Sequence, residues 1–204
     1  MIAVASLLVV GVLFLAGCQS KADNNEASSK NVLRVGTEGT YSPFSYRDDN
    51  DKLTGYDVDV AKAVAKKIDY KVKFVEAPWD SMLAAFDAKK SDVIFNQVSI
   101  TPERKEKYLF STPYSISHPA LIVNKDNNEI KDFADLKGKK SAQSLTSNYA
   151  QMAEDLGAEI SSVDGFSKAV ELVSDKRADA TLNDDVTYYD YLKQKPDAPI
   201  KIVK

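Results

Sequence analysis

An alternation of strand-like and helix-like segments runs through this chain twice, and it restricts the fold more than any other feature. In the first half, the segments with strand character are 32–36, 71–75 and 92–95, and those with helical period are 57–68 and 81–88. In the second half, strands are expected at 139–142, 159–163 and 178–182, and helices at 149–156, 167–173 and 185–193. Strands that alternate with helices form parallel sheets, so the pattern predicts an α/β fold with two lobes, each a parallel-sheet βαβαβ unit.

The order of these segments also gives expected domain boundaries. We expect the first lobe over residues 32–117 and the second over 118–199. The apolar run 120–123 is read as a further strand and a crossover between the lobes.

Composition excludes several classes of function. The 204 residues carry a formal net charge of −3, which argues against nucleic acid as an electrostatic partner. The chain has a single cysteine and a single histidine, His118. These are too few for a His/Cys metal cluster or for a catalytic pair built on several histidines. We therefore expect no metal and no cofactor, and assign His118 no role.

The N-terminus is almost wholly apolar up to a lone cysteine. About 14 apolar residues are too few to span a bilayer and suit the core of a signal peptide. The sequence Leu15-Ala16-Gly17-Cys18 resembles the lipobox of bacterial lipoproteins, although no Lys or Arg precedes the apolar core. We expect a signal peptide over 1–18, lipidation of Cys18, and a disordered tether over 19–31. The alternative is a structural cysteine on an apolar helix.

In open parallel sheets, ligands bind outside the carboxyl ends of the strands. The loops expected there are rich in aromatic, hydroxyl and acidic side chains. The candidates for a site are Glu38, Tyr41, Phe44, Trp79, Gln97, Ser99, Thr146, Ser147 and Asp184. An anion would find the helix start at 146–147, an ammonium would find Asp184, and aromatic rings would enclose an apolar body. An anion site and a cation site that face each other a few ångströms apart suit the carboxylate and the ammonium of an α-amino acid.

The segment 93–104 supplies the strongest candidate for anion binding. A short apolar strand is followed by Asn96 and Gln97, and Thr101-Pro102 reads as a helix cap with Pro at the first helical position. Arg104 falls in the first helical turn, where its planar fork can pair with a carboxylate.

Each candidate has a purely structural alternative. Arg104 can pair with Glu103 or Asp92 on a solvated face. Tyr41 and Phe44 can be core aromatics, and Ser147 and Asp184 can be helix caps. The tyrosines 188, 189 and 191 are interpreted as packing residues.

Several separate motifs resemble the amino-acid-binding proteins of ABC importers, solute-binding family 3. They are Gly36-Thr37-Glu38-Gly39-Thr40-Tyr41, Thr54-Gly55-Tyr56-Asp57-Val58-Asp59-Val60, Ser99-Ile100-Thr101-Pro102-Glu103-Arg104, Tyr108-Leu109-Phe110-Ser111-Thr112-Pro113-Tyr114, Asp135-Leu136-Lys137-Gly138-Lys139 and Asn183-Asp184. The resemblance runs from residue 32 to the end. The segments 96–98 and 141–149 further resemble the cystine-binding branch.

The resemblance implies a two-lobed periplasmic-binding-protein-like fold and roles at matching positions. Arg104 would hold the ligand carboxylate, helped by Ser99 and by Thr146 or Ser147. Asp184 would pair with the ammonium, with Gln97 and Ser99 contributing oxygens. Tyr41 and Trp79 would line the side-chain pocket, and Glu38 would meet the distal ammonium of a cystine.

The resemblance further implies a monomer, held by its lipid at the extracytoplasmic face of a bacterial membrane. It would close on an amino acid, with L-cystine as the first candidate, and dock on ABC permease subunits. It would not be an enzyme, because no bond is made or broken. Members of the family continue beyond the point matching Lys204 with a segment that returns to the first lobe. The resemblance therefore implies that residues 200–204 start this return and that the last part of the first lobe is missing. The alternatives are a receptor for glutamine, histidine or arginine, an exported cyclodehydratase-like enzyme, and a sensor input domain.

Overall fold

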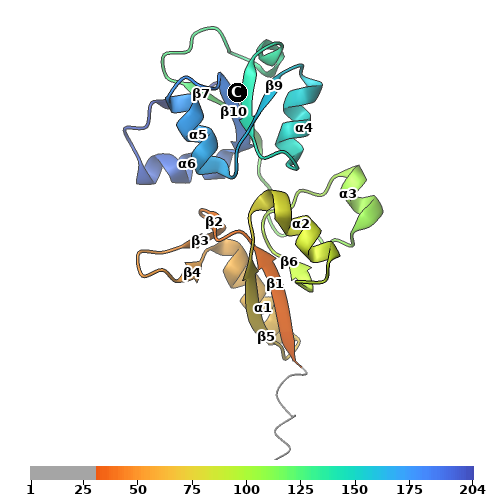
Figure 1. Cartoon of the computed structure of the whole chain (residues 1–204). Coiled ribbons are helices and arrows are strands. Elements are labelled where there is room, and N and C mark those ends of the chain that lie inside the picture. The colour runs from red at the N-terminus through yellow and green to blue at the C-terminus, as the bar shows by residue number, and fades with distance from the viewer. Residues whose placement is uncertain (1–30) are drawn as a thin grey trace, which may run out of the picture. The chain divides into compact units, whose positions relative to one another are not determined.

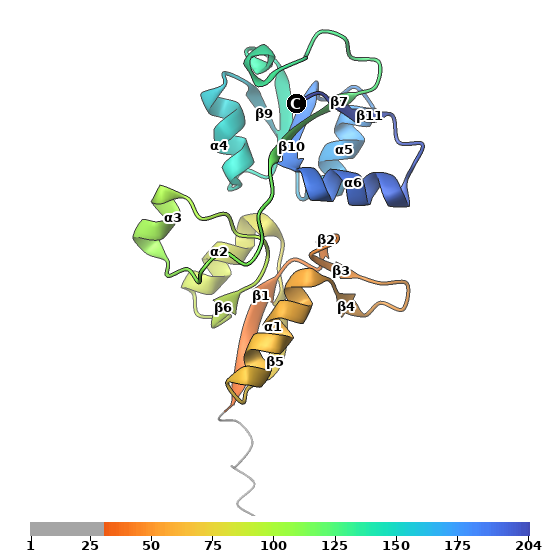
Figure 2. The same cartoon turned by 180° about the vertical axis from the view of Figure 1, so that it is seen from behind.

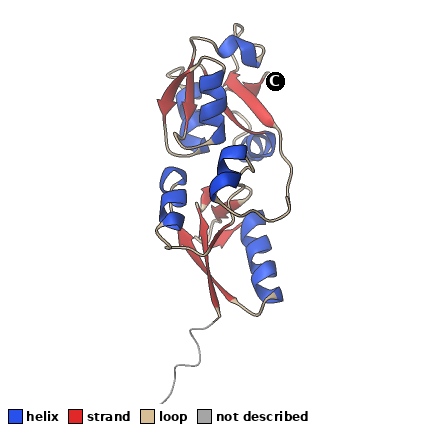
Figure 3. Cartoon of the chain, turned by 90° about the vertical axis from the view of Figure 1, so that its right-hand side faces the viewer, coloured by secondary structure: helices blue, strands red, loops and turns tan. Residues whose placement is uncertain are grey.

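The structure is a computed structural model that describes residues 31–204, which form two lobes built around separate sheets (Figures 1 and 3). The first lobe holds a sheet in the order β5-β1-β6 and a small sheet in the order β2-β3-β4. The second lobe holds a five-stranded sheet in the order β11-β7-β10-β8-β9. The predicted signal peptide, Cys18 and most of the predicted tether lie outside the described residues.

The strands of the first lobe are β1 (Val32–Thr37), β2 (Thr40–Tyr41), β3 (Ser45–Arg47), β4 (Leu53–Thr54), β5 (Lys71–Glu76) and β6 (Val93–Ile94). Those of the second are β7 (Pro119–Asn124), β8 (Lys140–Gln143), β9 (Glu159–Ser162), β10 (Ala180–Asp184) and β11 (Ile200–Ile202). The helices are α1 (Tyr56–Lys67), α2 (Trp79–Asp87), α3 (Pro102–Lys107), the 3₁₀ turn η1 (Phe133–Leu136), α4 (Asn148–Asp155), α5 (Phe166–Ser174) and α6 (Asp185–Gln194).

The first lobe has the predicted parallel sheet, with β1 paired in parallel to both β5 and β6. The helix α1 buries Val58, Ala61 and Ala65, which recur at helical spacing, and contacts β5. Figures 1 and 2 show α1 and α2 on opposite sides of this sheet. The loops that follow β1 and β6, and the first turn of α2, therefore meet at one edge of the lobe.

The second lobe is covered by helices on both faces of its sheet, and β7 shows this most directly. Ala120 and Ile122 pack in the cluster that includes α5, while Leu121 and Val123 pack in the cluster on the α4 side. Successive residues of a strand point to opposite faces, so a strand buried on both faces is apolar throughout. Full burial of Leu121, Ile122 or Val123 contributes about 1.5–3 kcal/mol each to the stability of the fold, relative to an exposed side chain.

The second lobe contains the predicted parallel βαβαβ unit, with β8 paired in parallel to both β10 and β9, but its sheet as a whole is mixed. The strand β7 is antiparallel to β10, and β11 is antiparallel to β7. The run 120–123 therefore belongs to the second lobe's sheet and is not a crossover. Residues 200–202, predicted to start a return to the first lobe, form the edge strand of the second lobe, and Leu121 donates its backbone N–H to the carbonyl of Lys204.

The sheet β2-β3-β4 is absent from the sequence expectations because its strands are only two or three residues long. A glycine joins it to α1. Gly55 has φ 119°, and a Cβ there would lie 2.4 Å from the carbonyl oxygen of Phe44. The turn therefore requires glycine, and it sets the start of α1 beside the site.

The chain passes from the first lobe to the second between α3 and β7, through a segment in which Ile116 is 85 % exposed. Within residues 31–204, no helix has both the length and the apolar character that crossing a membrane requires.

Candidate functional site

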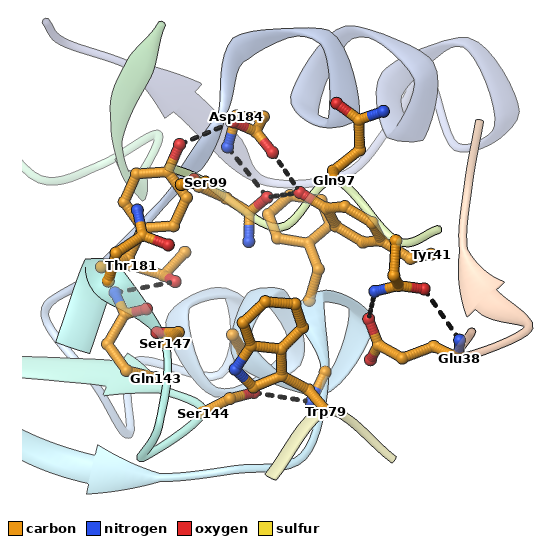
Figure 4. A pocket seen from close by; sticks show the side chains of 17 residues that line it. Glu38, Tyr41, Trp79, Gln97, Ser99, Gln143, Ser144, Ser147, Thr181 and Asp184 are labelled. Carbon is orange, nitrogen blue, oxygen red and sulfur yellow. Dashed lines mark hydrogen bonds between the residues drawn. The ribbon is translucent and has the colours of Figure 1, made fainter. Parts of the chain in front are cut away.

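A cavity between the two lobes collects the loops at the strand ends (Figure 4). Its empty space is about 550 Å³, counting the part open to solvent. Its lining from the first lobe is Glu38, Tyr41, Trp79, Asn96, Gln97 and Ser99. Its lining from the second lobe is Gln143, Ser144, Ser147, Asn148, Tyr149, Gly165, Phe166, Ala169, Thr181, Asn183 and Asp184.

A buried carboxylate, Asp184, stands at the end of β10 and is 6 % exposed. Three hydroxyl groups lie within hydrogen-bond distance of it: Tyr41 at 2.5 Å, Ser117 at 2.5 Å and Tyr149 at 2.6 Å. These donors come from the first lobe, the connecting segment and the second lobe. Among the described residues no basic side chain lies within ion-pair distance of Asp184.

The tyrosines around Asp184 remain donors. Burial, followed by the nearby Asp184 charge, raises the pKa of Tyr41 well above its ordinary value. The same two causes raise the pKa of Tyr149. The Tyr41 hydroxyl also lies 2.6 Å from Asn183 Oδ1, and its single hydrogen can serve only one of the two acceptors at a time.

A second carboxyl group, Glu38, lines another part of the cavity. Asn96, which is 1 % exposed, donates from Nδ2 to Glu38 Oε2 at 2.7 Å and accepts the Glu38 backbone N–H at 2.8 Å. Burial and, to a smaller extent, the charges of Asp164 and Asp80 together raise the pKa of Glu38 to about 7, against the opposing effect of the Asn96 hydrogen bond. Acidic surroundings of this kind favour a positively charged group at this end of the cavity.

The backbone at Gln97 is held in an uncommon conformation by a buried acid. Gln97 has φ 49°, which non-glycine residues rarely adopt. The fully buried Asp57, in the first turn of α1, accepts the Gln97 backbone N–H at 2.8 Å and its Nε2 at 2.7 Å. Burial raises the pKa of Asp57. Asp57 thereby fixes the loop that carries Ser99.

Arg104 is 9 % exposed and has no carboxylate within ion-pair distance among residues 31–204. Its guanidinium donates to the carbonyl of Ser99 at 3.1 Å and to that of Thr146 at 3.3 Å, and it lies 5.4 Å from the centre of the Trp79 ring. Burial lowers the pKa of Arg104, but a guanidinium stays charged. The predicted cap is confirmed, since Thr101 Oγ1 accepts the Arg104 backbone N–H.

Not every candidate lines the central cavity. Arg104 and Thr146 border an adjacent hollow that shares Ser147 and Asn148 with it. The donors of Thr146 are occupied: its backbone N–H and hydroxyl both bond Asp80 Oδ1 at 2.9 Å. Ser147 lines the cavity, and it also caps α4 by accepting the Ala150 N–H, which confirms the predicted cap.

Phe44 lies outside the cavity, 6 % exposed, with its ring centre 5.5 Å from that of Tyr41. Phe44 is therefore a core aromatic residue, as the structural alternative proposed. His118 is exposed, outside the cavity, and has a partner that sequence reasoning missed: its Nδ1 is 3.6 Å from Asp185 Oδ2.

Sequence reasoning also missed lining residues that lie within strands and helices. Gln143 ends β8, Thr181 lies in β10 and Ala169 lies in α5, whereas the rule of binding at strand ends points to loops. The sequence gives a usable signal for Thr181, which is a polar residue between the apolar Ala180 and Leu182 of the same strand.

The cavity therefore combines a buried cation at its border, a buried acid without a cation and aromatic walls between them. Trp79 contributes an indole N–H that is buried without a partner among the described residues. In the part of the chain that the structure describes, no three His, Cys, Asp or Glu side chains come together in a metal-binding arrangement. Such a site can bind a small zwitterion and orient it.

Comparison with known proteins gives a family match. Residues 33–186 match the profile of the bacterial extracellular solute-binding proteins, family 3. The chain is 44 % identical over 211 aligned positions to the L-cystine-binding protein TcyA of Bacillus subtilis, covering 97 % of this chain and 78 % of that protein. It spans 66 %, 78 % and 74 % of the length of three curated relatives.

Two solved structures differ in how well they superpose. An ancestral arginine-binding protein bound to arginine is 41 % identical, with a TM-score of 0.79, covering 85 % of this chain and 79 % of that chain. The L-cystine solute receptor of Neisseria gonorrhoeae in its unliganded open conformation is 51 % identical, with a TM-score of 0.52, covering 86 % and 74 %.

Proposed function

The chain belongs to family 3 of the bacterial extracellular solute-binding proteins, and from this premise we propose that it is the substrate-binding component of an amino-acid ABC importer. The observation that carries the proposal is that the site contains two buried groups of opposite charge, each without an ionic partner among the described residues. Among residues 31–204, no carboxylate pairs with the buried Arg104 and no cation pairs with the buried Asp184. Buried charges are costly unless they are paired, and an α-amino acid supplies both missing partners.

The proposed roles follow from this pairing. Arg104, with Ser99 and the start of α4 at Ser147, receives the α-carboxylate. Asp184, with Gln97, receives the α-ammonium. Tyr41 and Trp79 enclose the ligand side chain.

We propose L-cystine as the ligand, because Glu38 can meet a second ammonium at the far end of the side chain. Support comes from TcyA and from the gonococcal receptor, both described as binding L-cystine. Arginine is the competing candidate, because the ancestral protein bound to arginine is 41 % identical and a guanidinium also suits Glu38.

We propose that binding closes the two lobes about the connecting segment. The arginine-bound relative superposes better than the open, unliganded one, although its sequence is less similar. Hydrogen bonds between the lobes, such as Tyr41 to Asp184 and Ser42 to Asp190, agree with a closed arrangement. A ligand that contacts both lobes shifts the equilibrium toward closure.

Thermal unfolding tests the function. At about 100 times its dissociation constant, a ligand adds roughly 2.7 kcal/mol to the native state, which moves the melting midpoint by several degrees. We expect L-cystine to raise the midpoint most in a panel with arginine, glutamine and histidine. A larger shift with arginine would replace cystine as the ligand, and a cooperative melt that no amino acid shifts would contradict the receptor function.

We further propose that the protein is anchored through a lipid on Cys18 and delivers its ligand to membrane permease subunits. The support is the lipobox-like sequence before Cys18. Mass spectrometry of the protein from bacterial membranes is expected to find a lipid-bearing cysteine at the mature N-terminus. An unprocessed Met1 would contradict this anchor.

A further inference from the structure

The two lobes are also held together beside the cavity, by Asp80 in the first turn of α2. Its carboxylate accepts three hydrogen bonds from the second lobe: the Leu145 N–H at 3.2 Å, and the Thr146 N–H and hydroxyl at 2.9 Å each. Acceptor and donors are 65 and 66 residues apart in sequence. Among the described residues, no other carboxylate accepts three hydrogen bonds from the opposite lobe.

This contact lies next to the proposed head-group site. Trp79, the neighbour of Asp80, packs under the Arg104 guanidinium and lines the cavity. On the other side, Thr146 donates to Asp80 and accepts from Arg104 at its carbonyl, and Ser147 begins α4 directly after it. Asp80 therefore sets the position of the loop that presents the start of α4 to Arg104.

The three hydrogen bonds to Asp80 can form only when the two lobes are close together. All three donors are on a loop that moves with the second lobe, so lobe separation breaks the three bonds together. Hydrogen bonds to a charged acceptor are stronger than neutral ones. They stabilise the closed arrangement from outside the cavity lining, which does not include Asp80, Leu145 or Thr146, and Asp80 reaches the cavity only through the effect of its charge on Glu38.

We propose that Asp80 is a positioning residue that stabilises closure, and so tightens the binding of every ligand by the same factor. A change in the closed population scales apparent affinity equally for all ligands that require the closed state. A residue that contacts the ligand changes affinity unequally. The proposal rests on the proposed function only for its affinity readout, because the closure readout needs no ligand.

The test compares Asp80→Asn with Asp87→Asn. Asp87 is an exposed acid on the same helix that accepts from Tyr108 within the first lobe, so its replacement removes the same charge without affecting the interface. Titration calorimetry with L-cystine and L-arginine is expected to give dissociation constants about tenfold higher for Asp80→Asn with both ligands. Asp87→Asn is expected to match the parent protein.

Closure is measured separately, without ligand, by the distance between probes on the two lobes. Cysteines at Lys67→Cys in α1 and Lys168→Cys in α5 are both exposed and carry the probes, with Cys18→Ser to remove the natural thiol. Asp80→Asn is expected to shift the distance distribution to longer values. Thr146→Val, which removes one donor from the opposite lobe, is expected to do the same to a smaller extent.

Two results would overturn the proposal. One is an unchanged distance distribution in both Asp80→Asn and Thr146→Val. The other is a loss of affinity confined to one of the two ligands, which would make Asp80 a ligand contact. If neither amino acid binds the parent protein, the proposed function fails, and the distance measurement still decides the role of Asp80.

Discussion

Replacing Arg104 by alanine is expected to weaken amino-acid binding by about a hundredfold or more, roughly 3 kcal/mol. The guanidinium is buried, has no carboxylate partner in residues 31–204 and is oriented by the carbonyls of Ser99 and Thr146. A ligand carboxylate that enters this environment without the cation keeps its desolvation cost and loses its attraction. Titration calorimetry with the ligand that gives the largest thermal shift measures the effect.

The matched control is Arg34→Ala. Arg34 also belongs to the first lobe, but its side chain is 40 % exposed and forms an ion pair with Asp92 at 2.5 Å, away from the cavity. Exposed pairs contribute little, so affinity is expected to stay within about twofold of the parent. Arg104→Lys separates charge from geometry, because it keeps the charge and lacks the fork; it is expected to fall between the parent and Arg104→Ala. Unchanged affinity in Arg104→Ala would remove Arg104 from the site.

Local patterns in the sequence predicted the elements well. The helix expected at 57–68 is found as Tyr56–Lys67, and that expected at 167–173 as Phe166–Ser174. Their apolar spacing and bounding residues are local properties. The pairing of β7 with β10 and β11 was not predicted, because an apolar run reveals burial on both faces but not the direction of its neighbours.

The candidate site was predictable to the extent that it follows from strand ends. The rule that ligands bind at the carboxyl ends of strands selected Glu38, Gln97 and Asp184, which the structure brings to one cavity. The same rule wrongly included Phe44, since it cannot distinguish a lining aromatic from a core one. Asp80 was missed because its partners lie in the other lobe, and only the arrangement of the lobes brings them within reach.

Asp184→Asn is expected to weaken binding by about a hundredfold through loss of the ammonium partner. Asp184 accepts hydrogen bonds from the hydroxyls of Tyr41, Ser117 and Tyr149. Asparagine keeps one acceptor oxygen, and its amide group can donate to a hydroxyl oxygen, so the fold is expected to tolerate the change. The variant loses the attraction between the Asp184 charge and the ligand ammonium. Titration calorimetry with the amino acid that binds the parent protein measures this loss.

A ligand without ammonium groups isolates this term. For L-cystine the matching analogue is 3,3′-dithiodipropionic acid, which keeps the disulfide and both carboxylates. We expect this analogue to bind the parent protein weakly and Asp184→Asn equally weakly, because the ammonium contact is already gone. Asp185→Asn is the control, since this neighbour lies outside the cavity lining and donates no group to it; its affinity for the amino acid should match the parent. If Asp184→Asn weakens the analogue as much as the amino acid, Asp184 shapes the closed cavity and does not recognise the ammonium.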